Sequence, residues 1–338
     1  MAKPTSRHRP HVAVIGAGDI SQGYHLPSLQ HLAATGRCTF AAICDLDAKL
    51  AAAMARKFGA QRSYTDYVEM LRTEKPDGVV VITPIPVTAR VAGSVMRMGF
   101  PVLLEKPPGG SSKECRQLIR AAEESGMPNC VSFNRRFCPV LVQGHDEMAK
   151  RGPVKGASAR MFRLDRTDEE FFFGTGIHSL DTLRYLGGDI VSVETERRVV
   201  RAGERPTFSL ILGYANGGVG TLTIRPQAGI QLERYEVFGE QSMAIIHAGV
   251  GWLIDKPGSC EVYSAGKPVR LPDPLKPYRA FTGKLYDAAT GGFYGSEANF
   301  VESLRTGNAL SPDLAESLQS VEIAEAVQAG RSWKARSR

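Results

Sequence analysis

Between residues 11 and 133, short apolar segments alternate with amphipathic helical patterns, and this alternation constrains the fold more than any other feature of the sequence. Consecutive parallel strands need a crossover helix, and each gap between the apolar segments is long enough to hold one. The pattern therefore predicts an α/β domain with a doubly wound, Rossmann-type parallel sheet. The expected strands are His11–Ile15, Thr39–Cys44, Gly78–Ile82, Pro101–Leu104 and Asn129–Phe133, and the expected helices include Ala48–Phe58, Val87–Met98 and Lys113–Ser125.

After residue 150 the pattern changes to longer stretches of alternating apolar and polar residues, separated by turn dipeptides such as Asn216-Gly217. This is typical of antiparallel strands. The expected strands are Val154–Arg163, Ile190–Val200, Phe208–Tyr214, Gly218–Ile224 and Gln231–Phe238, and the expected helices are Thr175–Leu186, Ser296–Arg305 and Asp313–Ala329.

The length of 338 residues exceeds the size at which a single core stops growing, so the sequence predicts two domains. We expect a Rossmann domain over 1–133 and an α+β domain with a largely antiparallel sheet over 134–338. The second domain would hold substrate and form oligomer contacts, with the C-terminal helix able to pack back on the first domain. Lys267–Pro277 is rich in proline and is expected to be a surface loop.

Composition excludes several classes of protein. Hydrophobic content of 43% and charged content of 23% are ordinary for a globular protein, and no apolar run reaches the roughly 18 residues that a membrane-spanning helix needs. The net charge is +7, but the basic residues are dispersed and no nucleic-acid-binding motif is present. The six cysteines form no C-x-x-C pair, and the histidines form no zinc-type cluster. We therefore expect a cytoplasmic protein with free thiols, no metal, and a loose basic tail over Met1–Pro10.

A glycine turn follows the first expected strand, and a helical segment follows the turn. Gly16 makes the tight turn, Gly18 lets the backbone approach a pyrophosphate, and the helix N-terminus adds a positive dipole end. Asp19 and Ile20 complete this predicted dinucleotide-binding turn, with the Asp19 carboxylate pointing away from phosphate. Ser21 replaces the usual Gly or Ala, which predicts slightly wider packing of helix and strand. The alternative is a glycine turn without a ligand.

Asp45 ends the second expected strand, where a carboxylate can accept hydrogen bonds from the adenosine ribose and repel a 2′-phosphate. This position favours NAD, with NADP less favoured. The alternative is that Asp45, or Asp47, only caps the helix that begins near Ala48.

Two further segments carry groups suited to acid–base chemistry. Lys106 follows Glu105 at the carboxyl end of a later strand, where open α/β sheets bind their ligands, although a solvated Lys106–Glu105 pair is the plainer explanation. On the helix of the second domain, Asp181 lies one turn after His178 and is placed to orient its imidazole for proton transfer. A single helical histidine is more often a packed or solvated residue, and the spacing leaves both explanations open.

These motifs together resemble the family of glucose-fructose oxidoreductase, inositol dehydrogenase and the rhizopine catabolism protein (Gfo/Idh/MocA), over nearly the whole chain. Glu105-Lys106-Pro107 is the most specific element of the resemblance. The supporting motifs are Gly16-x-Gly18 with His25-Leu26-Pro27, Asp45, Tyr64-Thr65-Asp66, Pro76-Asp77-Gly78-Val79, Thr83-Pro84, Asn134-Arg135-Arg136-Phe137 and His178-x-x-Asp181.

The resemblance implies a role for each matching residue. Lys106 would lie beside the nicotinamide and the substrate, and His178 would act as the acid–base group at the reacting carbon. The remaining implied contacts are Thr83, Pro84 and Glu105 on the cofactor side and Arg136 and Thr175 on the substrate side.

Three positions depart from the family pattern. Gly174 stands where the family usually has Asp, four residues before the histidine, and Ile85 and Thr88 replace the Asn and His that commonly follow Thr-Pro. Asp181 is then the nearest carboxylate available to His178.

The resulting hypothesis is an NAD-dependent enzyme that transfers hydride to or from a carbinol carbon of a sugar-like, polyol or cyclitol substrate, and that forms a homodimer or homotetramer. One alternative is an enzyme that retains NAD and catalyses epimerisation, elimination or glycoside cleavage. Another is a dinucleotide-dependent binding protein without turnover, which Gly174 suggests.

Overall fold

The computed structural model describes residues 9–335, so most of the basic tail expected over Met1–Pro10 lies outside the described residues. The described chain forms two compact units. The N-terminal unit holds the described residues through Phe133 together with Thr282–Ala289 and Phe293–Leu318, and the C-terminal unit holds the remainder. Within residues 9–335, no helix is both long and apolar enough to cross a membrane.

The N-terminal unit is built on a six-stranded parallel sheet in the order β3-β2-β1-β4-β5-β6, which confirms the predicted Rossmann-type topology. Its strands are β1 (His11–Ile15), β2 (Thr39–Cys44), β3 (Arg62–Tyr64), β4 (Gly78–Val81), β5 (Val102–Glu105) and β6 (Asn129–Ser132). Val79, Val80 and Val81 are fully buried, as expected for a parallel strand covered on both faces.

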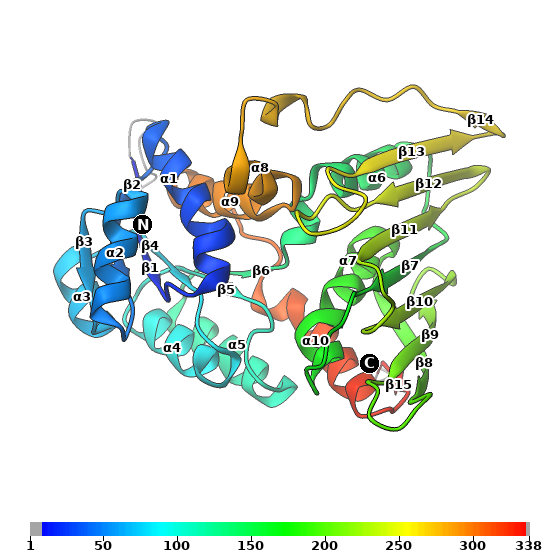
Figure 1. The fold of residues 1–338 in the computed structure, drawn as a ribbon, viewed down its shortest axis with the longest axis horizontal. Helices are drawn as coiled ribbons and strands as arrows, with labels where there is room; N and C mark the ends of the chain where they lie inside the picture. Colours follow the sequence, from blue (N-terminus) through cyan, green and yellow to red (C-terminus); the bar gives the residue numbers. More distant parts are fainter. Residues whose placement is uncertain (1–8, 336–338) are drawn as a thin grey trace. The chain divides into compact units, whose positions relative to one another are not determined.

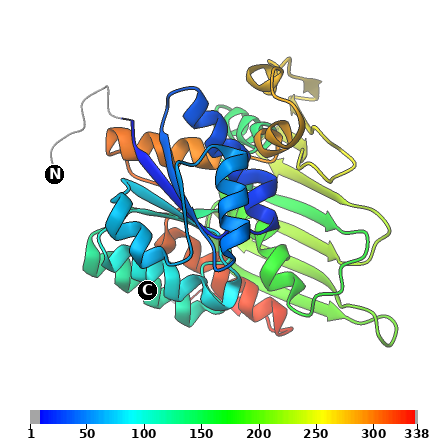
Figure 2. The ribbon, with the colours of Figure 1, turned by 60° about the vertical axis from the view of Figure 1, so that its left-hand side comes forward.

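Helices cover both faces of this sheet, and Figure 2 shows α4 and α5 (cyan) on the side opposite α9 (orange). One core joins apolar residues of α1, α2 and α9 to β1, β2 and β4. The helical segments are a π-helical turn (Ser21–His25), α1 (Leu26–Ala34), α2 (Ala48–Phe58), α3 (Tyr67–Glu74), α4 (Ile85–Arg97), α5 (Ser112–Ser125), α8 (Gly283–Thr290) and α9 (Phe293–Thr306). Helix α10 (Leu314–Gln328) begins in this unit, where Leu314 N donates to Asn129 Oδ1.

The C-terminal unit carries a nine-stranded sheet in the order β14-β13-β12-β11-β7-β10-β9-β8-β15, which runs from β14 at the top to β15 at the bottom of Figure 1. Its pairings are antiparallel except that of β7 with β10, so the predicted largely antiparallel α+β domain is confirmed. The strands are β7 (Gly156–Phe162), β8 (Ile190–Arg198), β9 (Thr207–Tyr214), β10 (Val219–Arg225), β11 (Leu232–Phe238), β12 (Ser242–His247), β13 (Ser259–Ser264), β14 (Lys267–Pro268) and β15 (Trp333–Lys334).

Helices α6 (Pro139–Ala149) and α7 (Ile177–Gly187) pack on one face of this sheet. Alternate residues of the central strand β7 are buried there, and the apolar stripe of α7 (Ile177, Leu180 and Leu183) is buried too. Residues between those of the inward face point to the opposite, more exposed face, because successive side chains of a strand alternate. A π-helical turn (Phe172–Gly176) precedes α7 and carries the chain into it.

The expected elements agree with the structure to within a few residues, and α2 agrees at both ends because Asp47 caps its start and Gly59 closes its end in the left-handed region. Strands β3, β12, β13 and β15 were not predicted. The Pro-rich segment Lys267–Pro277 contains the two-residue strand β14 and the start of a short 3₁₀ turn.

Candidate active site

In the N-terminal unit, three of the predicted cofactor segments begin where neighbouring parallel strands end. The glycine turn follows β1, Thr83 follows β4, and Lys106 follows β5, and these strands are adjacent in the sheet. Because parallel strands end at the same edge, the structure brings these segments together at the edge where such sheets bind ligands.

The glycine turn is held by hydrogen bonds from three sides. Gly16 N donates to Cys44 O at 2.8 Å, Ser21 Oγ donates to Gly16 O at 2.6 Å, and Ala17 N donates to Asp45 Oδ2 at 2.8 Å. Ser21 is therefore a buried part of the turn rather than only a bulkier helix residue. A Cβ atom at Gly18 would meet no atom within 4 Å, so the backbone there is open to a pyrophosphate. Asp19 and Ile20 are exposed beside it.

Asp45 and Asp47 have different hydrogen-bonding partners. The side chain of Asp47 caps α2 by accepting from Lys49 N and Leu50 N. Asp45 does not cap the helix, because its Oδ1 accepts from Asp47 N and its Oδ2 from Ala17 N. Asp45 thus connects the end of β2 to the glycine turn, and its proposed contact with the adenosine ribose is compatible with this position.

Replacing Asp45 with Ser should reduce the preference for NADH over NADPH by at least about tenfold in the ratio of dissociation constants, because the charge that repels a 2′-phosphate is lost. Fluorescence titration with both dinucleotides measures this ratio. Asp47→Ser is the matched control, since Ser also caps helices and the ratio should not change. A wild-type protein that binds NADPH more tightly than NADH would contradict the assignment.

The segment after β4 is fixed by Thr88, one of the positions that depart from the family pattern. Thr88 is buried, and its Oγ1 lies within hydrogen-bond distance of three oxygens. It can donate to Thr83 O at 2.9 Å or to Pro84 O at 3.1 Å, and it lies 3.0 Å from Thr83 Oγ1. The Thr88 hydroxyl therefore stabilises the first turn of α4. Pro84 is exposed and Thr83 is half-buried. The implied contact of Thr83 and Pro84 with the nicotinamide stays a prediction.

Glu105 and Lys106 are joined at the end of β5. Lys106 N donates to Glu105 Oε2 at 3.0 Å, and the peptide bond from Lys106 to Pro107 is cis. Burial alone raises the pKa of Glu105, but its hydrogen bond with His25 and the charges of His25 and Lys106 outweigh burial and lower it. Glu105 is therefore a buried carboxylate, 9% exposed, and not half of a solvated pair.

In the C-terminal unit, His178 lies at the first turn of α7 and is 6% exposed. Arg135 Nη1 lies 3.4 Å from its Nε2. An arginine only donates hydrogen bonds, so this contact favours the imidazole that keeps a lone pair on Nε2. Arg135 in turn donates two hydrogen bonds to Glu233, and the shorter of them is 2.7 Å long. Glu233 also forms a salt bridge with Arg163.

Arg136 and Asp181, for which the sequence predicted separate roles, form a largely buried salt bridge with each other. Arg136 Nε and Nη2 donate to the two oxygens of Asp181, each at 2.8 Å, and Ser320 Oγ donates to Asp181 Oδ1 at 3.1 Å. The roles expected from the sequence, Asp181 orienting His178 and Arg136 near substrate, stay predictions. The geometry establishes that Asp181 fixes the direction of the Arg136 guanidinium.

Gly174 and Thr175 lie in the π-helical turn before α7. A Cβ at Gly174 would meet no atom within 4 Å, so the family's usual Asp would find space at this position. Thr175 Oγ1 accepts from Arg166 Nη2 at 3.4 Å and is half-buried.

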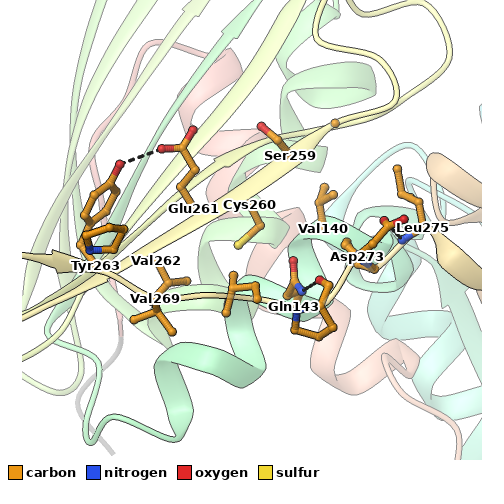
Figure 3. Close-up of a pocket in the computed structure, with 15 residues that line it drawn as sticks. Val140, Gln143, Ser259, Cys260, Glu261, Val262, Tyr263, Val269, Asp273 and Leu275 are labelled. Atoms are coloured by element: carbon orange, nitrogen blue, oxygen red, sulfur yellow. Dashed lines mark hydrogen bonds between the residues drawn. The ribbon is translucent and has the colours of Figure 1, made fainter.

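A pocket of about 370 Å³ lies elsewhere in the C-terminal unit, between α6, β13 and the segment after β14 (Figure 3). Gln143 Nε2 donates to Pro272 O at 2.7 Å and ties that segment to α6. Burial raises the pKa of the Cys260 thiol in the pocket to about 12, so no thiolate forms there near neutral pH. None of the residues lining the pocket is a predicted site residue.

Sequence reasoning missed several residues that hold these groups. Arg135 and His25 occur in the motifs that carry the family resemblance, but nothing in their spacing assigned them partners. Glu233 and Glu297 have no local signal, because each meets its partner only through the tertiary fold.

Two family models match the chain. Residues 11–133 match "Oxidoreductase family, NAD-binding Rossmann fold" of Gfo/Idh/MocA, and residues 142–245 match "GFO/IDH/MocA C-terminal domain".

Several curated proteins and solved structures are similar to this chain. Inositol 2-dehydrogenase 2 of Saccharopolyspora erythraea is 28% identical, over 70% of this chain and 73% of its own. 4-Carboxy-2-hydroxymuconate-6-semialdehyde dehydrogenase of Sphingobium is 30% identical, over 63% and 71%. The structure of levoglucosan dehydrogenase in complex with NADH superposes with a TM-score of 0.78 at 18% identity, over 97% of this chain and 99% of the other, and shares the fold.

Proposed function

Because the chain belongs to the Gfo/Idh/MocA family of NAD-binding oxidoreductases, we propose that it transfers hydride between NAD and a hydroxyl-bearing carbon of a cyclitol, polyol or sugar. The observation that carries the proposal lies in the N-terminal unit. There the open glycine turn, which would hold the pyrophosphate of a dinucleotide, and Lys106 follow strands that end at the same edge of the sheet.

The proposed substrate class is inferred from the substrates that the names of similar proteins state. The first relative acts, by its name, on inositol, a cyclitol, and the family resemblance extends to sugars. The semialdehyde dehydrogenase from Sphingobium shows that a relative of similar identity is named for a different compound. A semialdehyde therefore belongs in the substrate test beside the cyclitols and sugars.

In the proposed mechanism, Lys106 donates a hydrogen bond to the substrate oxygen and stabilises the negative charge that develops there. Glu105 accepts from Lys106 N and thereby fixes the backbone from which the ammonium extends. The bound nicotinamide supplies or accepts the hydride.

His178 takes the proton of the substrate hydroxyl at Nε2 and returns it in the reverse direction. The Arg135 guanidinium, 3.4 Å from Nε2, keeps that nitrogen unprotonated before substrate binds, and it gives up this contact when the substrate hydroxyl donates to the same lone pair. The bonds from Arg135 to Glu233 and to Asn134 Oδ1 keep the guanidinium in place. Arg136, held by Asp181, is the proposed donor to a further substrate oxygen.

NADH absorbance measured with a panel of inositols, aldoses, polyols and an aromatic semialdehyde tests the proposal. Turnover with a member of the cyclitol, polyol or sugar group supports it. NADH formation only with the semialdehyde would overturn the substrate class and leave the cofactor assignment intact.

Lys106→Ala and His178→Ala should each lower kcat by about a hundredfold or more, because each removes a group that acts on the reacting atoms. The dissociation constant for NADH should change by less than about threefold. Lys113→Ala and His145→Ala are matched controls, exposed or partly exposed residues of the same types, and should leave kcat unchanged. A His178→Ala variant with near wild-type turnover would rule out the mechanism.

Gly174 distinguishes the proposal from its alternatives. If the wild-type protein binds NADH and substrate without turnover, Gly174→Asp restores the carboxylate four residues before His178, at a position with open space for it. A gain of turnover in that variant would identify the wild-type chain as a binding protein that lost this group. Product formation from tightly retained NAD, without net NADH, would instead favour the epimerase or lyase alternative.

A further inference from the structure

Inside the N-terminal unit, His25 lies between two buried carboxyl groups that belong to distant parts of the chain. Its Nδ1 is 2.6 Å from Glu297 Oε1 on α9, and its Nε2 is 2.9 Å from Glu105 Oε1 at the end of β5. His25 and Glu297 are fully buried, and the ring edge of His25 meets the Phe293 ring at a centroid distance of 5.4 Å.

The chemistry of these contacts fixes the number of protons that they hold. An ionised carboxylate only accepts hydrogen bonds, so each ring nitrogen either carries a proton or faces a protonated carboxyl group. In both cases the three side chains share two protons and carry a single net negative charge. The Lys106 ammonium, whose charge acts on Glu105, balances that charge.

The direction of the pKa shifts agrees with a protonated His25. Burial alone lowers the pKa of His25, but hydrogen bonds with Glu105 and Glu297, together with their charges, raise it to about 9. The pKa of Glu297 is raised by burial, which outweighs its bond with His25. Burial, followed by the charge of Glu297, also raises the pKa of the neighbouring Cys38 thiol, which therefore stays neutral.

Glu105 connects this group to Lys106. One of its oxygens bonds with His25 and the other accepts from Lys106 N, so the carboxylate is fixed at both ends. His25 is fixed in the same way by Glu105 and Glu297. The second oxygen of Glu297, Oε2, is buried without a hydrogen-bond partner among the described residues. The carboxyl group at 297 therefore makes its one hydrogen bond to His25.

We propose that Glu297 is a positioning residue for Lys106, acting through His25 and Glu105. Glu297 holds the imidazole, the imidazole holds Glu105, and Glu105 holds the backbone of Lys106 and attracts its ammonium charge. Helix α9 thus contributes to the catalytic geometry although it follows the substrate unit in the chain. The inference rests on the proposed function in one respect, that Lys106 acts on the substrate.

The test compares Glu297→Leu, which removes the hydrogen bond to His25, with Glu297→Gln, which keeps one. The matched control on the same helix is Glu302→Leu, because Glu302 is partly exposed and pairs with Arg305. Glu297→Leu should lower kcat at least tenfold, while NADH affinity changes less than about twofold. Glu297→Gln should restore kcat to within about threefold of wild type, and Glu302→Leu should have no effect. Equal loss in the Leu and Gln variants, or none in the Leu variant, would overturn the inference.

Two measurements do not depend on turnover and separate this inference from the proposed function. In ¹⁵N NMR of histidine-labelled wild-type protein at pH 7.5, both ring nitrogens of His25 should be protonated. The rate at which an amine-specific reagent modifies Lys106, read by mass spectrometry, should change at least threefold in Glu297→Leu and not in the Gln or Glu302 variants. If Glu297→Leu does not fold, Glu297→Met replaces it. Ring-nitrogen signals of His25 that are the same in wild type and in Glu297→Leu, or an unchanged Lys106 rate, would refute the inference whether or not a substrate is found.

Discussion

Glu233→Gln should lower the free energy of unfolding by about 3–5 kcal/mol, the cost of removing one partner from a buried ion pair. Glu233 is fully buried and binds Arg135 and Arg163, which are each only 2% exposed. Gln keeps the shape of the side chain but leaves two buried guanidinium groups without a counter-charge. Urea unfolding followed by fluorescence measures the loss.

The matched control is Glu236→Gln, because Glu236 lies three residues along the same strand on the opposite face and is only half-buried. It faces Arg160 at 3.6 Å near solvent, so its loss should cost about 1 kcal/mol or less. Equal effects of the two substitutions would contradict the importance of the buried cluster.

The same carboxylate predicts how stability depends on acid. Burial raises the pKa of Glu233, but the charges of Arg135 and Arg163 outweigh burial and lower it to about 2. A lowered pKa means that the folded state binds fewer protons than the unfolded state, so this contribution is present above the usual pKa of 4.5 and is lost as the pH falls towards 2. The free energy of unfolding should fall over this range, and it should fall less in Glu233→Gln.

Gly16→Ala and Gly18→Ala should both weaken NADH binding, but only Gly16→Ala should destabilise the fold. Gly16 has a φ of +103°, and a Cβ there would lie 2.0 Å from the backbone oxygen of Ile82, which no side-chain movement relieves. Gly16→Ala should therefore destabilise the protein by roughly 3 kcal/mol or more and abolish NADH binding with it.

At Gly18 the added methyl group meets no protein atom within 4 Å, so stability should stay within about 0.5 kcal/mol of wild type. The methyl group would occupy the space through which the pyrophosphate approaches the backbone, and NADH affinity should fall at least about tenfold. Unfolding curves and fluorescence titration of both variants separate the two effects. A Gly18→Ala protein that binds NADH normally would show that the turn does not approach the cofactor.

Local patterns were sufficient to predict the elements whose signals lie within a few residues. The Asp47 cap and the closing Gly59 determine α2, and the Asn216-Gly217 dipeptide marks the turn between β9 and β10. The parallel pairing of β7 with β10 was not predictable, because hydrophobic alternation shows which face is buried but not which strand lies alongside. Strand β13 was missed because its exposed polar residues resemble a loop.

The candidate site was predictable to a similar degree. Motifs identified Lys106 and His178, but not the groups that hold them, since Glu297 and Glu233 become neighbours only through folding. Arg135 and Arg136 illustrate what the sequence could not predict about the site. The family resemblance implied a position near the substrate for Arg136, which stays a prediction. The structure places Arg135 against His178, and adjacent positions of a 3₁₀ turn give no periodic signal that assigns this contact.

The late position of α9 in the chain has a consequence for synthesis on the ribosome. The core of the N-terminal unit includes Phe300 and Val301, and His25 is separated from Glu297 by 272 positions. At about 5–20 residues per second, α1 leaves the ribosome roughly 15–55 s before the helix that covers it. During that interval Leu26, Leu29 and Leu32 lack the α9 side of their core. The nascent chain therefore presents an apolar surface until α9 has been synthesised, and this unit completes its folding only after most of the second unit has been translated.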